Sequence, residues 1–444
     1  MVTGSDQPLP EGLSSRLRFI GPGIILAAAA IGSGELILTP RAGALYGMSI
    51  AWVIVLSIIY KMTLTIGLAR YTIATGEDIF RGFSRLPGPR FWFVWVLSLL
   101  FLIGAVGYSG IALACGSALY ALFPSFSMVQ WAVVVVVLAY ALLLGGSYGP
   151  VEKMSFVLSS ILIIGVIYSL AVLRPEADWF FRGVVPDIPA GSGVTIISLL
   201  GWTAGGASTL VYSFWILEKG IGLRGKDRVS PGEGRSFPIA IKRMRSWMSL
   251  VLLDVGLSYL LMIVVSLAFL TIGVLVLRTA GPEGGPLIPA REETTLILSR
   301  LLTTAAGPQA RFIFLIAALA ILLSTVIGLV DGKSRALRTG LKMIFVRSSR
   351  ISDVGLYRLF VTLMFSIIFV FLFTGRPVAL IVLISALEAP MLSLSAIMLV
   401  YLLYRKLPEA FRPGLGWLLI ITVGTVLYLA FSSLVLFQTL VQLF

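Results

Sequence analysis

Two interrupted apolar segments decide how this chain folds: IGSGE at residues 31–35 and GWTAGGAST at residues 201–209. Each places glycine and small polar residues in the middle of a run long enough to cross a bilayer. Glycine costs about 1 kcal/mol relative to alanine inside a helix, so both segments favour local unwinding. Unwound backbone at that depth is tolerated where it lines a cavity or is buried in protein. The two segments therefore predict a pair of broken membrane helices around a cavity.

The rest of the chain is apolar enough to supply a bundle of membrane helices. Of its 444 residues, 58% are hydrophobic and 12% are charged, and a soluble protein of this composition would expose large apolar patches. No run alternates as a barrel strand does, so helices are expected. The predicted fold class is an all-α integral membrane protein. Its eleven predicted transmembrane helices lie at residues 19–40, 46–68, 92–122, 128–147, 154–173, 194–216, 247–277, 309–331, 355–374, 378–403 and 416–440.

The order of these runs predicts two inverted five-helix repeats. The interrupted runs begin successive sets at residues 19–173 and 194–403, with an additional helix 11 at 416–440 and a cytoplasmic N-terminal tail at 1–18. The first run begins inside and the sixth begins outside, so the two sets have opposite topology. Matched interruptions in inverted halves are the strongest sequence indication of a substrate site at the midplane. The alternative is that these glycines only permit close helix packing.

Basic residues orient the predicted helices. With the N-terminus in the cytoplasm, the inner segments hold 24 of the 34 Lys and Arg residues and the outer segments hold seven. This bias predicts a multi-pass protein of the cell membrane with a cytoplasmic N-terminus and an extracytoplasmic C-terminus. The net charge of +14 lies mostly in short loops, so no nucleic-acid partner is expected. The longest inner loop, at 218–245, either contacts anionic headgroups or is a solvated connector.

The side chains that many catalytic sites need are missing. The chain has no histidine, and Cys115 is its one cysteine and lies in an apolar run. These facts exclude histidine general bases, HExxH zinc chemistry and histidine haem ligation. No constellation of Ser with Lys, or of Asp and Glu, suggests a reaction. We therefore expect neither an enzyme nor a cofactor. A channel is an alternative class of membrane protein, but it would not need two helices interrupted at matching positions.

Several short motifs resemble those of the Nramp metal-ion transporters. They are GPG at 21–23, Gly34, RAGA at 41–44, AR at 69–70 with TGED at 75–78, and Gly206-Ala207 at the interruption of the sixth run. The resemblance covers nearly the whole chain by topology and is most specific in the first, second and sixth runs. It implies a LeuT-like fold and secondary transport by alternating access.

The resemblance also implies that the family's metal-binding side chains are replaced here. The family usually has Asp-Pro-Gly-Asn in its first broken helix, where this chain has Gly32 in place of the Asp and Glu35 in place of the Asn. The Met-Pro-His of its sixth helix aligns with residues 210–212, Leu-Val-Tyr. The thioether that favours soft transition metals and the histidine associated with proton movement are thus absent. Acidic proton-pathway positions align with Tyr108 and Ile111.

One charge is gained within the membrane. Lys61 lies inside an apolar run, and a charge at that depth is by default a functional hypothesis. Its expected partner is Glu35; the alternatives are a structural ion pair and a lysine that snorkels toward an interface. The predicted coupling residues, for protons or sodium, are Glu35, Asp254 and Glu388, of which the last two are alternatively buried hydrogen-bonding residues. The predicted substrate-binding residues are Gly32, Ser33, Gly34, Glu35, Lys61, Gly206, Ala207, Ser208, Thr209 and Tyr212.

The sequence is compatible with two classes of substrate. It favours a small anion, and the alternative is a divalent cation. Lys61 and the half-helix N-termini, with Ser33, Ser208 and Thr209, would supply donors for an oxyanion such as bicarbonate. The alternative is a hard cation such as magnesium, or manganese, because Glu35 and backbone carbonyls can hold an ion that keeps its waters. The expected partners are the small ion, co-transported sodium or protons, and the lipid bilayer. The sequence does not set the oligomeric state.

Overall fold

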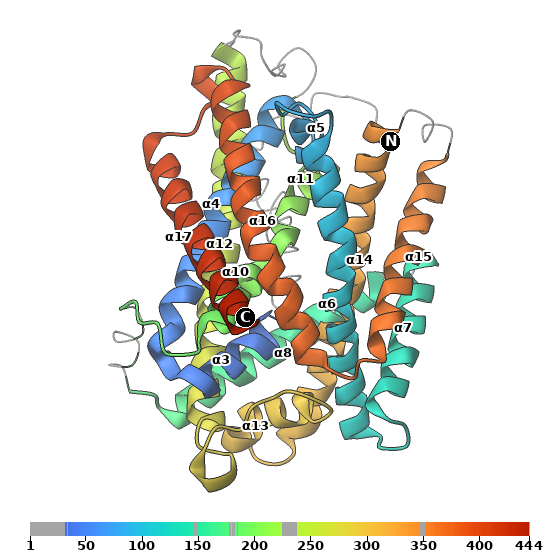
Figure 1. Cartoon of the computed structure of the whole chain (residues 1–444), viewed down its shortest axis with the longest axis vertical. Helices are drawn as coiled ribbons and strands as arrows, with labels where there is room; N and C mark the ends of the chain where they lie inside the picture. Colours follow the sequence, from blue (N-terminus) through green and yellow to red (C-terminus); the bar gives the residue numbers. More distant parts are fainter. Residues whose placement is uncertain are drawn as a thin grey trace.

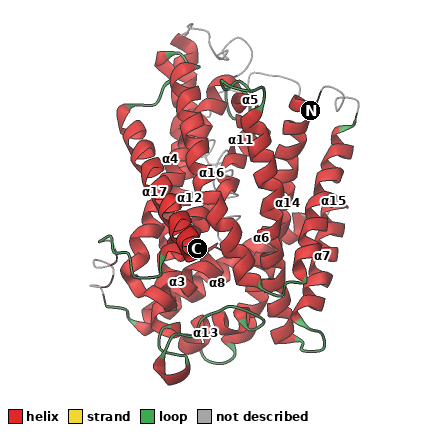
Figure 2. Ribbon diagram, in the orientation of Figure 1, coloured by secondary structure: helices red, strands yellow, loops and turns green. Residues whose placement is uncertain are grey.

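The computed structural model describes a bundle of helices. It covers residues 32, 34–145, 149–176, 179, 183, 185–223, 238–345 and 351–443, without the side chains of 149–155 and 436–443. Every regular element among these residues is a helix (Figure 2), so the all-α fold class is confirmed. Ile31 and Ser33 lie outside the described residues, and the break in the first helix therefore stays a prediction.

The long helices run between the two ends of the molecule (Figure 1). In the described part, nine helices or joined helices are long and apolar enough to cross a bilayer, and Met128–Leu144 is a shorter apolar helix. One of the nine, Gly34–Thr75, joins the end of the predicted first span to the second. All eleven predicted spans are therefore represented.

The elements have the following bounds. They are η1 Gly34–Leu38, α3 Thr39–Tyr46, η2 Gly47–Ile50, α4 Ala51–Thr75, α5 Ile79–Phe83, α6 Trp92–Leu122, α7 Met128–Leu144, α8 Gly149–Leu173, α10 Gly193–Trp202, η3 Thr203–Val211, α11 Tyr212–Glu218, α12 Pro238–Ile272, η5 Gly273–Leu277, η6 Pro282–Gly284, α13 Thr294–Ala306, α14 Ala310–Ile344, α15 Asp353–Leu372, α16 Pro377–Arg405, η8 Glu409–Phe411 and α17 Leu415–Leu443.

The largest differences from the predicted spans are in three helices. α12 begins at residue 238 instead of 247, and α14 ends at residue 344 instead of 331. An apolar run locates the part of a helix that faces lipid or core, but it does not mark where the helix ends in water or in protein. The third difference is α13, a short helix between the seventh and eighth spans that lies at the lower end of Figure 1.

Glycines bring the backbones of three helices into contact. A Cβ atom on Gly201 of α10 would lie 1.7 Å from the carbonyl oxygen of Ser385 in α16. A Cβ atom on Gly110 of α6 would lie 2.4 Å from the carbonyl oxygen of Pro377, where α16 begins. Small residues permit this close approach in membrane bundles. For Gly201, close packing is therefore the main reason for glycine.

The TGED motif forms a capped turn between α4 and α5. Gly76 ends α4 with a φ of 67°, a left-handed conformation that glycine adopts without strain. Oδ1 of Asp78 then accepts a hydrogen bond from the backbone N–H of Arg81 at 3.1 Å and begins α5. The Arg85 guanidinium donates to both carboxylate oxygens of Glu77, and this raises the pKa of Arg85. The turn is thus fixed by side chains of the motif.

Candidate functional site

The sixth helix is broken as the sequence predicts. The backbone leaves helical geometry at the start of η3, where Ala204 and Gly205 have φ values of 56° and 89°. Gly206 follows with a φ of 54° and a ψ of −141°. Left-handed backbone costs an alanine about 1–2 kcal/mol but costs a glycine little. The two glycines therefore supply the break, and neighbouring groups must hold Ala204 in place.

Lys61 of α4 binds the carbonyl end of α10. Its Nζ donates to the carbonyl oxygen of Gly201 at 3.0 Å and to that of Thr203. The last carbonyls of a helix have no partner within it and carry the negative end of its dipole. The side chain of Lys61 is fully buried, so these carbonyls replace water around its ammonium group. The lysine therefore caps the first half of the broken helix.

Two acids bind the opposite, amide side of the break. Oε1 of Glu35 accepts from the N–H of Ala204 at 2.9 Å and from Oγ of Ser266 at 3.4 Å. Oε2 of Glu388 in α16 accepts from the N–H of Ala207 at 2.9 Å. Free amides at the beginning of a helical segment favour negative charge. The break thus faces an ammonium group on its carbonyl side and carboxylates on its amide side.

A buried ion pair extends this arrangement to α14. Nζ of Lys333 lies 3.0 Å from Oε1 of Glu388, and each side chain is only 1% exposed. The ammonium group also lies 5.1 Å from the ring centroid of Phe101 and 4.9 Å from that of Tyr108. Aromatic faces attract a cation at this range. Tyr108, which aligns with a proton-pathway position of the family, here contacts a fixed cation.

Lys333 is a buried charge at the break that is not among the residues predicted from the sequence. The predicted eighth span ends at residue 331, which places Lys333 among the basic residues of an inner loop. The lysine in fact lies inside α14 and is buried, so its placement in a loop was wrong. A longer eighth span would have placed it within the membrane, where it would have been singled out on the same grounds as Lys61.

The expected direct pairing of Lys61 with Glu35 is not present among the described ion pairs. Lys61 binds carbonyl oxygens, whereas Glu35 binds an amide, so both charges act on the same break from opposite sides. The reason is that a broken helix offers buried carbonyl and amide groups, and a buried charge can be satisfied by either.

The other predicted residues gather around the same segment. Ser208 and Thr209 are buried in η3, and the hydroxyl of Tyr212 donates to Oδ2 of Asp254 in α12 at 3.2 Å. A Cβ atom on Gly32 would lie 2.5 Å from Oγ1 of Thr325 in α14. Gly34 is also close, since its added Cβ would lie 3.0 Å from the carbonyl oxygen of Trp202. Ser33 lies outside the described residues.

Some polar groups at the break remain available for a ligand. Oε2 of Glu35 and Oγ1 of Thr203 are buried and have no hydrogen-bond partner in the described part of the chain. Lys61 has three N–H donors, two of which bind carbonyls. By contrast, the amides of Ala204 and Ala207, at the break where half-helix N-termini were expected to supply donors for an oxyanion, are occupied by carboxylates. The groups at the break without a partner among the described residues therefore include hydrogen-bond donors, on Lys61 and Thr203, and an acceptor, Oε2 of Glu35.

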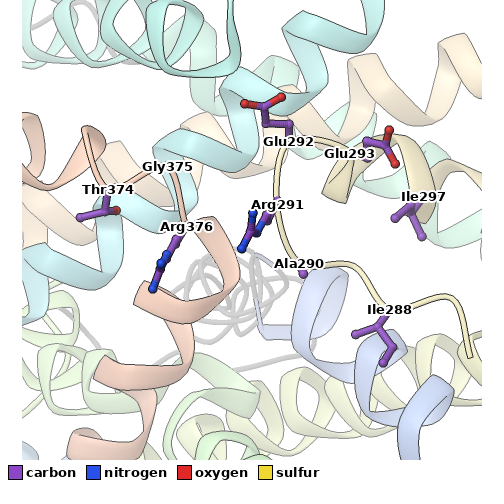
Figure 3. A pocket seen from close by; sticks show the side chains of 9 residues that line it. All are labelled: Ile288, Ala290, Arg291, Glu292, Glu293, Ile297, Thr374, Gly375 and Arg376. Carbon is purple, nitrogen blue, oxygen red and sulfur yellow. The ribbon is translucent and has the colours of Figure 1, made fainter.

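Two hollows with arginines in their walls lie near the start of α16, at the end of the molecule that carries α13. One hollow of about 700 Å³ is lined by Arg291 and Arg376, with Glu292 and Glu293 on its wall. Figure 3 shows the two arginines reaching into it from different segments. A second hollow of about 420 Å³ is lined by both arginines and by Arg41 of α3. None of these three arginines forms an ion pair with a described residue.

Solved membrane transporters share this arrangement of helices. A manganese transporter of Eremococcus coleocola aligns with a TM-score of 0.62 and 17% identity over 96% of this chain and 88% of its own. Mhp1, a nucleobase-cation-symport-1 family transporter, aligns with a TM-score of 0.57 and 15% identity over 93% and 91%. The likeness to these structures shows the fold, and with the long apolar helices it defines a multi-pass membrane protein of LeuT-like fold.

Within that class, the chain belongs to the Nramp family. The family of natural resistance-associated macrophage protein-like proteins matches residues 23–438. An uncharacterised protein of Pasteurella multocida is 24% identical over 339 residues, which are 74% of this chain and 72% of that protein. The divalent metal cation transporter MntH of Deinococcus radiodurans is 29% identical over 202 residues, 44% of this chain and 45% of that protein. The predicted family resemblance is confirmed.

Proposed function

We propose that this Nramp-family transporter moves a small anion, such as bicarbonate, across the cell membrane by alternating access. The proposed orientation has the N-terminus in the cytoplasm and the C-terminus outside, as the distribution of basic residues favours. The substrate would bind at the break between α10 and η3. The proposed binding residues remain those predicted from the sequence, and Thr203 joins them.

The observation that carries this proposal is the buried ammonium group of Lys61 at the break. Lys61 binds the break directly and has no ion-pair partner among the described residues, whereas the charge of Lys333 is offset by Glu388. A divalent cation would be repelled by Lys61 in a medium of low dielectric constant, where charges interact more strongly than in water. An anion would be attracted to the third N–H of Lys61 and the hydroxyl of Thr203.

The hollow of about 420 Å³ supports the same sign of charge. Arg41, Arg291 and Arg376 line it, and its lining includes no acidic side chain. Clefts lined by charge of one sign raise the local concentration of the opposite ion and speed its association. These arginines would concentrate anions at the outer mouth and oppose the approach of a divalent cation.

A divalent cation is the second candidate, and Glu35 is the observation that favours it. Its Oε2 is buried and free to accept, and a hard cation such as magnesium binds carboxylates while retaining waters. Several similar proteins are, by name, metal transporters. The same oxygen fits a coupling role, because a proton or sodium ion bound there would satisfy it.

Uptake into proteoliposomes separates the two candidates. Labelled bicarbonate, manganese and magnesium are each tested with and without sodium or proton gradients. We expect saturable bicarbonate uptake that exceeds the equilibrium level under one gradient and no uptake of manganese. Manganese accumulation without bicarbonate uptake would overturn the anion proposal.

Two lysine variants give that assay a matched control. Lys61→Met removes the buried ammonium group, and we expect it to lower anion uptake at least tenfold. Lys342→Met removes a partly exposed ammonium group that pairs with Asp353 far from the break, and we expect uptake within twofold of the unmodified protein.

A further inference from the structure

Side chains of other helices bind two of the last carbonyls of α10, those of Leu200 and Gly201. Ser57 lies one helical turn before Lys61 on α4, so the two side chains leave the same face of that helix. Oγ of Ser57 donates to the carbonyl oxygen of Leu200 at 3.4 Å, and the hydroxyl of Tyr428 in α17 donates to the same oxygen at 3.0 Å. The carbonyl oxygen of the next residue, Gly201, accepts a hydrogen bond from Nζ of Lys61.

Such a carbonyl end is where transporters built on broken helices hold a cation. Unwound carbonyls and half-helix C-termini coordinate the sodium ion or proton that drives transport. In this chain the ammonium group of Lys61 takes the position between the carbonyls of Gly201 and Thr203. It supplies one positive charge there, as a bound monovalent cation would.

Burial keeps the side chain of Lys61 inside the bundle. Lys61 is fully buried, and its own carbonyl oxygen accepts from the hydroxyl of Thr65 at 2.8 Å. Thr65 is in turn 2.7 Å from the hydroxyl of Tyr259 in α12. A lysine that snorkelled to an interface would keep its ammonium group in water instead. Packing therefore holds this charge at the break.

We infer that Lys61 is a tethered cation that replaces a dissociable monovalent ion at the carbonyl end of α10. Because the ammonium nitrogen is covalently attached, this position neither binds nor releases a sodium ion during a transport cycle. Any coupling to a sodium gradient must then act elsewhere, and Glu35 at the same break has a carboxylate oxygen without a hydrogen-bond partner among the described residues. This inference rests on the proposed transport cycle, but it does not depend on the sign of the substrate's charge.

The test removes the covalently attached ammonium group of Lys61 and supplies a free cation in solution. In purified full-length Lys61→Ala, the two carbonyls lose their ammonium partner, and space for a small ion is left behind. Thermal unfolding in detergent is measured in chloride salts of methylammonium, sodium or bulky N-methylglucamine at equal ionic strength. We expect methylammonium, or sodium, to raise the apparent Tm of Lys61→Ala by about 4 °C over N-methylglucamine, because a ligand that binds only the folded state stabilises it.

Two proteins serve as matched controls. The unmodified chain already holds its ammonium group, so methylammonium should not raise its Tm above the value in N-methylglucamine. Lys61→Met fills the space with an uncharged side chain of similar length, so no salt should rescue it. No cation-specific rise in Lys61→Ala, or an equal rise in all three proteins, would refute the tethered-cation role.

The tethered-cation role of Lys61 can also be tested when Lys61→Ala folds poorly. When Lys61→Ala is not recovered as folded protein, it is expressed and purified with methylammonium in every buffer, alongside Lys61→Ser. Recovery that depends on methylammonium supports the inference, and failure of both variants with the cation present overturns it. Since no transport is measured, failure here leaves the uptake result intact, and the converse also holds.

Discussion

The ion pair between Lys333 and Glu388 yields the sharpest prediction for stability. The two charged groups are 3.0 Å apart and each side chain is 1% exposed, so neither charge can be hydrated when its partner is removed. Breaking a buried pair from one side costs about 3–5 kcal/mol, whereas replacing both partners by neutral groups is often close to neutral. We therefore expect Lys333→Met and Glu388→Gln each to lose about 3–5 kcal/mol of unfolding free energy.

The double variant distinguishes this explanation from ordinary packing loss. Lys333→Met with Glu388→Gln leaves no uncompensated charge, and the glutamine oxygen can still accept from the N–H of Ala207. Its loss should be smaller than that of either single variant. The loss of the ring contacts to Lys333 should account for about 1–2 kcal/mol of what remains.

The assay is reversible unfolding by SDS in mixed micelles, followed by tryptophan fluorescence. Lys342→Met provides the comparison for an exposed pair, because Lys342 and its partner Asp353 are 31% and 62% exposed. Such pairs contribute about 0–1 kcal/mol. Additive losses in the double variant, or equal losses at Lys342 and Lys333, would show that the buried pair does not act as a coupled unit.

Two other variants test the break and its packing. Gly201→Ala places a Cβ atom 1.7 Å from the carbonyl oxygen of Ser385, so we expect little folded protein by size-exclusion chromatography. Gly256→Ala in α12 meets no atom within 4 Å and should elute as the unmodified chain does; equal yields would contradict the close contact. Glu35→Gln keeps an acceptor for the N–H of Ala204 but cannot take up a proton. We expect it to fold and exchange substrate but to lose gradient-driven accumulation at least tenfold, and unchanged accumulation would exclude Glu35 from coupling.

The sequence by itself determined the class of fold and the place of the break in the sixth helix. Long apolar runs require helices, because a backbone in lipid must satisfy its own hydrogen bonds. The Gly205-Gly206 pair marks the break of the sixth helix, because left-handed backbone is open to glycine at little cost. Lys61 and Glu35 were singled out because a charge within the membrane is expensive unless it has a function or a partner.

Only the tertiary structure decided which groups satisfy those charges. Lys61 was expected to meet Glu35, but it meets the carbonyls of Gly201 and Thr203 instead. Lys333 and Glu388 are 55 positions apart in the sequence, and no local sequence pattern predicts a contact over that separation. The physical reason is that a break exposes carbonyl and amide groups together. Which of them a buried charge binds depends on how four separate helices pack around that point.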